Sequence, residues 1–216
     1  MLLFFVACAL AFFIACETVQ KPADPTLPTP TPQPVKESLA WAGKHKDADL
    51  WTEKLKQAIV ASNLPESVPT DIKTFCPGYE KLDKQGKLVV WMQLMSIMTK
   101  YESSFNPKTY YMEPPPLGYS SIGLFQLSYE DQANYPDCQL IRKEKNLEDG
   151  VTNIKCAVII LSKLVSRDNR VAGYVGGWKG GARYWSVLRS DNKGKPRPAY
   201  SGIVAYMKSV KECKAD

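Results

Sequence analysis

Histidine is almost missing from this chain of 216 residues, since His45 is the only one. His45 lies upstream of the region that carries the strongest motifs, which argues against catalysis by a histidine-based triad. The sequence also lacks a zinc-type spacing of Cys and His, a phosphate-binding glycine loop and a nucleic-acid motif. No spacing therefore predicts a metal ion or an organic cofactor, and no nucleic-acid partner is expected.

The sequence also lacks a run of apolar residues that is long enough to span a membrane. Residues 1–15 are apolar and uncharged, but they are too few and too close to the N-terminus for a stable span. They lead into Ile14-Ala15-Cys16, which resembles the lipobox of bacterial lipoproteins, although no cation follows Met1 and Phe13 stands where Leu is usual. The resemblance implies a signal peptide over residues 1–16 and lipid attachment to Cys16; plain secretion is the alternative. Either way we expect an exported protein of the periplasm or cell envelope.

Proline is concentrated close to the N-terminus. Residues 17–40 are rich in Pro and Thr, and the stretch from Lys21 to Val35 favours an extended polyproline backbone of about 3 Å per residue. We interpret residues 17–40 as a semi-rigid linker, with a disordered leader as the alternative. The remaining residues, 41–216, have the length of a single domain.

Strand signals are few, and the spacing of apolar residues predicts a mainly α fold. Residues 88–98 are apolar nearly all round, which is typical of a buried helix, and residues 154–165 predict a second one. Shorter helices are expected after Ser128, over residues 185–189 and over residues 203–210, and a small hairpin near residues 108–127. A helix capped by Asp47 should have an apolar face made of Leu50, Trp51, Leu55, Ala58 and Ile59.

Glu102 stands at the end of the buried helix, just before Asn106-Pro107 stops it. A carboxyl group in that position is partly desolvated, which disfavours its charged form and raises its pKa. A carboxyl that is protonated at neutral pH can act as a general acid. The alternative is a charged side chain that reaches water at the helix end.

Two motifs surround this residue, Glu102-Ser103-Ser104-Phe105-Asn106-Pro107 and Ser121-Ile122-Gly123-Leu124-Phe125-Gln126-Leu127. They resemble the first two signature motifs of the lytic transglycosylases and goose-type lysozymes, which cut the glycan strands of peptidoglycan. Residues 149–161 resemble the third, helical motif. Residues 173–178 stand where the family usually has Ala-Tyr-Asn-x-Gly, but the Asn is missing. The resemblance spans roughly residues 85–190 and implies a single lysozyme-like domain, mainly α with a small β element, over residues 41–216.

The chemistry that this resemblance implies depends on a second carboxylate. Glu102 would protonate the β-1,4 glycosidic oxygen between N-acetylmuramic acid and glucosamine or N-acetylglucosamine. In a lytic transglycosylase the muramyl 6-hydroxyl then closes a 1,6-anhydro ring, whereas in a lysozyme a second carboxylate helps water to attack. Glu113, on a loop with three prolines between the two motifs, is the candidate for that group. Both outcomes stay open.

Glu113 has two further interpretations. Its loop resembles that of lysozymes from predatory bacteria that prefer deacetylated walls, which implies that Glu113 holds the ammonium group of a deacetylated glucosamine. Otherwise Glu113 is a solvated loop residue. Because the fourth motif lacks its Asn, a catalytically silent lipoprotein that binds the cell wall is a further alternative to an enzyme.

The same resemblance implies the substrate contacts. Ser121, Gly123 and Gln126 should line the cleft, Gly123 by letting a sugar approach the backbone and Gln126 by offering a donor and an acceptor. Tyr174 matches the Tyr of the fourth motif and is expected to contact sugar. Tyr119 is a candidate platform for stacking on a sugar, with packing in the core or an interface as the alternative. The expected partner is the glycan strand of peptidoglycan, whose acidic peptide stems suit the net charge of +6. A membrane would be contacted only through lipid on Cys16, and no oligomeric state is predicted.

The six cysteines fall into two groups. Cys8 and Cys16 belong to the expected signal, and the even number left in an exported chain indicates two disulfides. Four cysteines allow three pairings. We favour Cys138–Cys156, which closes a short loop, and Cys76–Cys213, which fastens the ends of the domain, with free thiols as the alternative. Each bond should contribute roughly 2–4 kcal/mol to stability.

Overall fold

The structure is a computed structural model that describes residues 38–190 and 197–214. The expected signal peptide, Cys16 and nearly all of the expected linker therefore lie outside the described residues. Within the described ranges, no helix has both the length and the apolar character needed to cross a membrane. The described residues form one compact unit, which is the part of the chain that carries the site.

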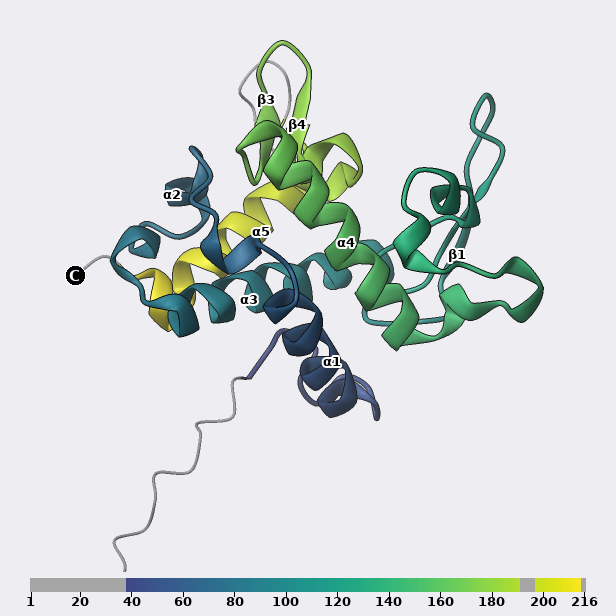
Figure 1. Ribbon diagram of the computed structural model, residues 1–216, viewed down its shortest axis with the longest axis horizontal. Coiled ribbons are helices and arrows are strands. Elements are labelled where there is room, and N and C mark those ends of the chain that lie inside the picture. The colour runs from purple at the N-terminus through teal and green to yellow at the C-terminus, as the bar shows by residue number, and fades with distance from the viewer. Residues whose placement is uncertain (1–37, 191–196, 215–216) are drawn as a thin grey trace, which may run out of the picture. The chain divides into compact units, whose positions relative to one another are not determined.

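Five α-helices are described in residues 38–190 and 197–214, and they build most of this unit: α1 (Ala48–Val60), α2 (Ile72–Phe75), α3 (Lys84–Ser103), α4 (Gly150–Asp168) and α5 (Pro198–Ser209). Helix α3 contacts α1 and α5, and α4 contacts α1 and strand β4 (Trp178–Gly180), as Figure 1 shows. Short 3-10 turns connect these helices. The mainly α prediction is confirmed.

Helix α3 forms the centre of the core because its sequence presents apolar groups on every side. Its residues from position 88 to position 99 are all buried, as predicted for residues 88–98. Asp83 caps the helix, since its carboxylate accepts a 2.7 Å hydrogen bond from the Gly86 backbone N–H. The helix ends at Ser103, and Ser104 follows in the left-handed conformation with φ of 52°. Glu102 thus lies in the last turn of a helix whose direction is fixed by packing.

Helix α4 fixes the turn that follows the second motif. Asn153, fully buried in α4, accepts a 2.9 Å hydrogen bond from the Phe125 backbone N–H through Oδ1. Its Nδ2 donates to the backbone oxygens of Ile122 at 2.9 Å and Leu147 at 3.0 Å. One amide side chain therefore satisfies three backbone groups that would otherwise be buried without partners. The turn around Gly123 is held against α4 by these bonds.

Two small antiparallel hairpins complete the fold. Strands β1 (Tyr110–Met112) and β2 (Ser120–Ile122) pair with Tyr110 opposite Ile122, where the sequence predicts a hairpin. Strands β3 (Ala172–Tyr174) and β4 pair with Ala172 opposite Gly180, and the sequence did not predict this second hairpin. Its glycines conceal it from pattern analysis, because they lower strand propensity while supplying the positive φ angles that the tight turn needs.

The prediction for the first helix is wrong in two details. Trp51, Leu55 and Ile59 are buried, but Leu50 is 48% exposed because it lies about 100° round the helix from Trp51. Asp47 precedes the helix without a capping hydrogen bond from its side chain. A capping residue needs an extended backbone, and Asp47 does not have one. Its backbone N–H donates to His45 Nδ1 at 3.1 Å.

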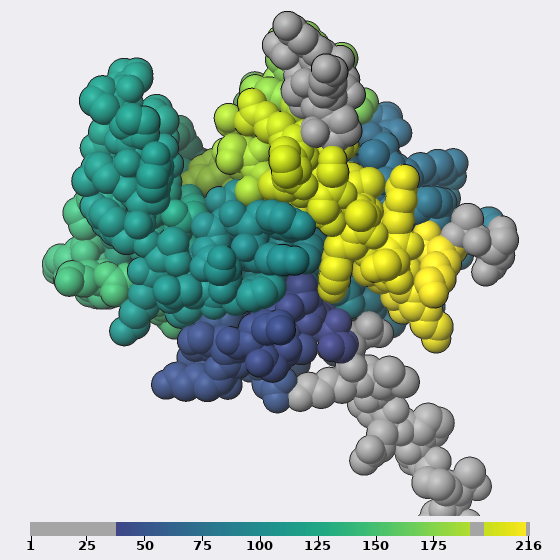
Figure 2. All heavy atoms as spheres, turned by 180° about the vertical axis from the view of Figure 1, so that it is seen from behind, coloured from purple at the N-terminus to yellow at the C-terminus, as the bar shows by residue number. Residues whose placement is uncertain are grey.

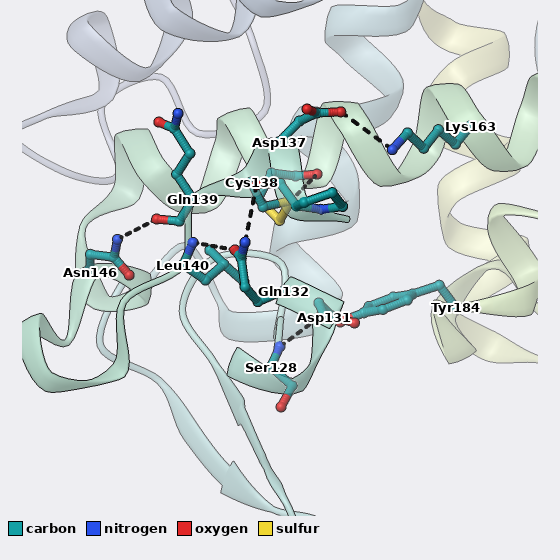
Figure 3. The surroundings of a disulfide bond; sticks show 12 residues. Ser128, Asp131, Gln132, Asp137, Cys138, Gln139, Leu140, Asn146, Lys163 and Tyr184 are labelled. Atoms are coloured by element: carbon teal, nitrogen blue, oxygen red, sulfur yellow. Dashed lines mark hydrogen bonds and ion pairs between the residues drawn. A yellow bond between two sulfur atoms is a disulfide. The ribbon is translucent and has the colours of Figure 1, made fainter. Parts of the chain in front are cut away.

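Two disulfides are present, and they join the cysteines that the sequence favoured as pairs. Cys76 is bonded to Cys213 across 137 positions of sequence, with the Cα atoms 4.4 Å apart. Cys138 is bonded to Cys156 of α4 across 18 positions. Figure 3 shows the second bond beside a network in which Gln132 Oε1 accepts a 2.6 Å bond from the Leu140 backbone. The segment after the second motif is thereby attached to α4.

Candidate active site

A cleft of about 380 Å³ runs past the end of α3. One side is formed by the segment between Glu102 and Gln126, which includes the β1–β2 hairpin, and the other by residues 183–189. Figure 2 shows the molecule hollowed between the projecting teal segment and the yellow-green one. Its lining residues are Glu102, Glu113, Leu117, Tyr119, Ser121, Gln126, Arg183, Tyr184, Trp185, Ser186 and Arg189.

A second lobe of about 410 Å³ continues the cleft beyond the two glutamates. It shares Glu102, Glu113, Ser121, Gln126 and Ser186 with the first lobe and adds Thr109, Tyr110 and Tyr111. Tyr110 and Tyr111 are more than half exposed, so their rings are accessible from solvent. The carboxyl pair is therefore flanked by space on both sides, which suits an extended chain lying across it.

Glu102 is a desolvated carboxyl in the middle of this cleft. The pKa of Glu102 is raised to about 8, mainly by burial and secondly by the nearby negative charge of Glu113. Arg189 and the Val187 backbone N–H act in the opposite direction and lower it. Its buried Oε1 accepts no hydrogen bond from any of the described residues. The group is protonated at neutral pH and has a free oxygen, which are the properties of a general acid.

Glu113 is the second carboxylate of the cleft, and the backbone orients it. Its N–H donates to the Tyr119 backbone oxygen at 2.9 Å, which extends the β1–β2 pairing by one hydrogen bond. Ser121, buried in β2, donates its hydroxyl to Glu113 Oε1 at 2.7 Å. Across residues 38–190 and 197–214, no Lys, Arg or His forms an ion pair with Glu113. Its charge faces the cleft without a counter-ion from the described chain.

Gln126 lines the cleft, but its donor groups are already used. Its Nε2 donates to the backbone oxygens of Gly123 at 2.9 Å and Thr109 at 3.1 Å. Both N–H groups of the amide are therefore used within the chain, and the carbonyl oxygen is the group that Gln126 could offer to a substrate. Gln126 also has a φ of 50°, so these bonds hold a backbone conformation that a non-glycine residue rarely adopts.

Gly123 does not line the cleft, and the reason predicted for it is wrong. It has a φ of +80°, and a Cβ there would lie 2.3 Å from Asn153 Nδ2 and 2.6 Å from the Leu147 backbone oxygen. The close approach that requires glycine is therefore to α4 and the turn before it, not to a sugar. Gly123 positions the cleft residues on either side of it.

The two predicted tyrosines are in different places. Tyr119 lines the first lobe, from the segment that joins β1 to β2. Tyr174 lies outside the cleft lining: its side chain is 46% exposed at the end of β3, and its ring contacts Trp178 edge-on at 5.1 Å. Tyr174 is the last residue of β3 and pairs with Trp178 of β4, so it belongs to the β3–β4 hairpin.

The tyrosine that does line the cleft from this region is Tyr184, which the sequence analysis missed. Its hydroxyl donates to Asp131, whose carboxylate also accepts a 2.8 Å hydrogen bond from the Ser128 backbone N–H (Figure 3). Burial is the main reason that the pKa of Tyr184 is raised well above its ordinary value. No local pattern distinguishes Tyr184 from the other ten tyrosines of the chain.

Arg189 is the second residue that the sequence analysis missed. Its guanidinium lines the first lobe, lies over the Trp178 ring at 5.6 Å and donates through Nε to the Ala182 backbone oxygen at 2.9 Å. Neighbouring Arg183 is bound through Nε and Nη2 to the carboxylate of Asp168. The chain contains 28 Lys and Arg residues, and no spacing identifies the two arginines that line the cleft.

Known proteins resemble this chain in sequence and in fold. The transglycosylase SLT domain family matches residues 81–198. No curated protein sequence matches the chain. The solved wild-type structure of DslA from the predatory bacterium Bdellovibrio is 35% identical over 82% of this chain and 98% of its own, with a TM-score of 0.74. A glutamate-to-glutamine variant of DslA is 34% identical over 82% of this chain and 97% of its own, also with a TM-score of 0.74.

A second glutamate-to-glutamine variant of DslA matches with a TM-score of 0.73 at 34% identity, over 82% of this chain and 97% of its own. The two substituted glutamates in these variants are 11 positions apart in DslA, and Glu102 and Glu113 have the same separation here.

Proposed function

The chain belongs to the transglycosylase SLT domain family, whose members are peptidoglycan glycosidases, and on that premise we propose that Glu102 is its general acid. Glu102 donates its proton to the β-1,4 glycosidic oxygen between a muramyl and a glucosaminyl residue. The C1–O bond then breaks, and the leaving sugar departs with a neutral hydroxyl. The observation that carries this proposal is a protonated, desolvated carboxyl with a free oxygen at the centre of a two-lobed cleft.

Glu113 completes the reaction as the second carboxylate. It lines both lobes with Glu102 and is oriented by Ser121, so its anion can support a water molecule that attacks C1. The different environments of the two glutamates separate an acid from a base, which is the usual arrangement for hydrolysis of a glycoside. The equal spacing of the two substituted glutamates in DslA supports the choice of this pair. We therefore favour hydrolysis.

The second candidate is anhydro-ring formation without water, which the family membership favours. In that reaction Glu102 takes back a proton from the muramyl 6-hydroxyl as that oxygen attacks C1. Glu113 would then take no part in bond breaking.

The substrate that best fits Glu113 is a deacetylated strand. A glucosaminyl residue without its acetyl group carries an ammonium, and this cation would supply the counter-ion that Glu113 lacks among the described residues. An acetylated residue offers no charge there. We expect the enzyme to cleave deacetylated strands faster for this reason.

We also propose that the enzyme is exported and attached to a membrane. Family members act on peptidoglycan outside the cytoplasm. Residues 1–16 would direct export, lipid on Cys16 would anchor the chain, and residues 17–40 would form the spacer that reaches the wall. Metabolic labelling with a radioactive fatty acid tests the anchor, because a Cys16→Ala variant should lose the label.

Mass spectrometry of the products tests the reaction. The purified protein is incubated with sacculi in native and chemically deacetylated forms. Reducing muramyl ends support hydrolysis, and anhydro-muramyl ends support the second candidate. Faster release from the deacetylated form, abolished in Glu113→Gln, supports the ammonium contact. If Glu102→Gln releases the same products at the same rate as the wild type, the role of Glu102 is disproved.

A further inference from the structure

The cleft is lined by two arginines whose electrostatic states differ. Arg183 is neutralised, because its guanidinium binds the Asp168 carboxylate with two nitrogens. Arg189 is not. In the described residues, 38–190 and 197–214, no carboxylate lies within ion-pair distance of its guanidinium. The first lobe therefore contains one positive charge without a counter-ion.

The Arg189 guanidinium is held in place by uncharged groups. Nε donates to the Ala182 backbone oxygen at 2.9 Å, Nη2 donates to the Arg183 backbone oxygen at 3.3 Å, and the plane lies over the Trp178 indole. A guanidinium has five N–H donors, so these bonds leave three for a ligand. The side chain is half-buried and fixed, which reduces the entropy lost when it binds an anion.

Glu102 does not explain this charge. The two groups interact, but Glu102 is protonated at neutral pH and carries no charge to neutralise the arginine. Arg189 also lowers the pKa of Glu102 and so acts against the protonated state that a general acid requires. If Arg189 interacted with Glu102 alone, it would only weaken Glu102 as a general acid. Its positive charge therefore calls for another partner.

We propose that Arg189 is a specificity-determining residue that binds a carboxylate carried by the muramyl residue of the substrate. This inference rests on the proposed function. The muramyl side chain is a lactyl ether that ends in a carboxyl group. In strands without peptides this carboxyl group is free. In the other strands it is joined to a peptide stem, which has carboxylates of its own. Both sources present the same ligand, a planar carboxylate that a guanidinium can bind with two parallel hydrogen bonds.

The two unpaired charges of the cleft, on Glu113 and Arg189, would then bind two neighbouring sugars of opposite charge. Glu113 attracts the ammonium of a deacetylated glucosaminyl residue, and Arg189 attracts the carboxylate of the muramyl residue beside it. Because these sugars alternate along the strand, opposite charges on the cleft distinguish one register of the strand from the other. Arg189 would thereby help to determine which of the two kinds of glycosidic bond meets Glu102.

The test compares three forms of one glycan, in the acetylation state that the wild type cleaves faster. The first has been stripped of peptides by an amidase and has free lactyl carboxylates. The second is the first after conversion of those carboxylates to neutral methylamides. The third retains its peptide stems. The values of kcat/KM are measured for the wild type, Arg189→Met and Arg189→Lys, with thermal unfolding to verify that each variant is folded.

We expect the wild type to prefer at least one carboxylate-bearing form over the methylamide by about tenfold or more, mainly through KM. The form that is preferred identifies the source of the carboxylate. Arg189→Met should abolish the preference, and Arg189→Lys should keep part of it, because a lysine retains the charge but not the two-pronged geometry. Arg167→Met removes an exposed arginine outside the cleft lining and should change nothing.

An equal loss on all three glycans in Arg189→Met would overturn the inference, because a shift in the pKa of Glu102 or a loss of structure affects every substrate alike. A wild type that does not distinguish the carboxylates from the methylamide would overturn it too. In either case the proposed function stands, provided that the wild type cleaves the glycans and Glu102→Gln does not. If the wild type cleaves none of them, the proposed function itself fails.

Discussion

The negative charge of Glu113 raises the pKa of Glu102 within a shared cleft. Burial is the larger cause and the neighbouring carboxylate is the second. A second negative charge beside Glu113 is unfavourable, so Glu102 keeps its proton. The Ser121 hydroxyl donates a hydrogen bond to Glu113 and stabilises its negative charge. The environments of the two glutamates therefore differ, and this difference underlies the proposed division of roles between them.

The pH dependence of cleavage should follow the protonation of Glu102. Since its pKa is raised to about 8, the active protonated form dominates below that pH and is lost above it. We expect kcat/KM to fall tenfold for each pH unit above the pKa of Glu102. Initial rates on soluble glycan across the alkaline range measure this limb. A limb near the ordinary pKa of a glutamate would contradict the burial argument.

Replacing Glu113 by Gln should lower the pKa of Glu102, because it removes a negative charge that favours the protonated form. Burial would still hold the pKa above 4.5, the ordinary value. Carbon-13 NMR of labelled glutamate carboxyls reports the titration directly and does not require activity. Glu53→Gln, on the exposed side of α1, serves as the matched control and should leave the Glu102 titration unchanged.

The variant Glu102→Gln should be more stable than the wild type near neutral pH. The folded state holds the Glu102 proton up to about pH 8, whereas the unfolded chain releases it near 4.5, so wild-type stability falls as the pH rises through this window. A neutral Gln avoids this loss, and the gain should be about 3 kcal/mol near pH 7. Denaturant unfolding at about pH 5 and about pH 7.5 measures it; a gain that shrinks with rising pH would contradict the sign.

The substitution Gly123→Ala should disrupt the packing between α4 and the turn that positions the cleft residues. Its Cβ would lie 2.3 Å from Asn153 Nδ2, so the turn or α4 must shift, and we expect a loss of more than about 3 kcal/mol. Gly118→Ala is the matched control. It also has a positive φ, but nothing lies within 4 Å of its Cβ position, so the cost should be about 1 kcal/mol. Thermal unfolding distinguishes the two, and equal losses would show that backbone strain alone requires Gly123.

The sequence was sufficient for features that depend on local chemistry. The burial of Glu102 could be predicted because the apolar residues before it leave the helix no solvent-facing side. The β1–β2 hairpin and the short 3-10 helix after Ser128 (Tyr129–Ala133) also follow from residues near each of them.

Features that depend on contacts distant in sequence could not be predicted. The atoms that require glycine at position 123 belong to Asn153, 30 residues later. Tyr184 and Arg189 line the cleft, and their side chains donate hydrogen bonds to Asp131 and to the Ala182 backbone oxygen. Such pairings are set by the packing of whole elements, and no pattern within either segment encodes them.

The measurement that tests the account most directly is the rate of glycan cleavage by Glu102→Gln, with thermal unfolding as evidence that the variant is folded. Gln is close to Glu in size but has no proton to give to a leaving oxygen. We predict that the rate falls by a factor of about 10² to 10⁴, the usual contribution of a general acid, while unfolding occurs at the same or a higher temperature. A folded variant that retains most of the wild-type rate would contradict the assignment of Glu102.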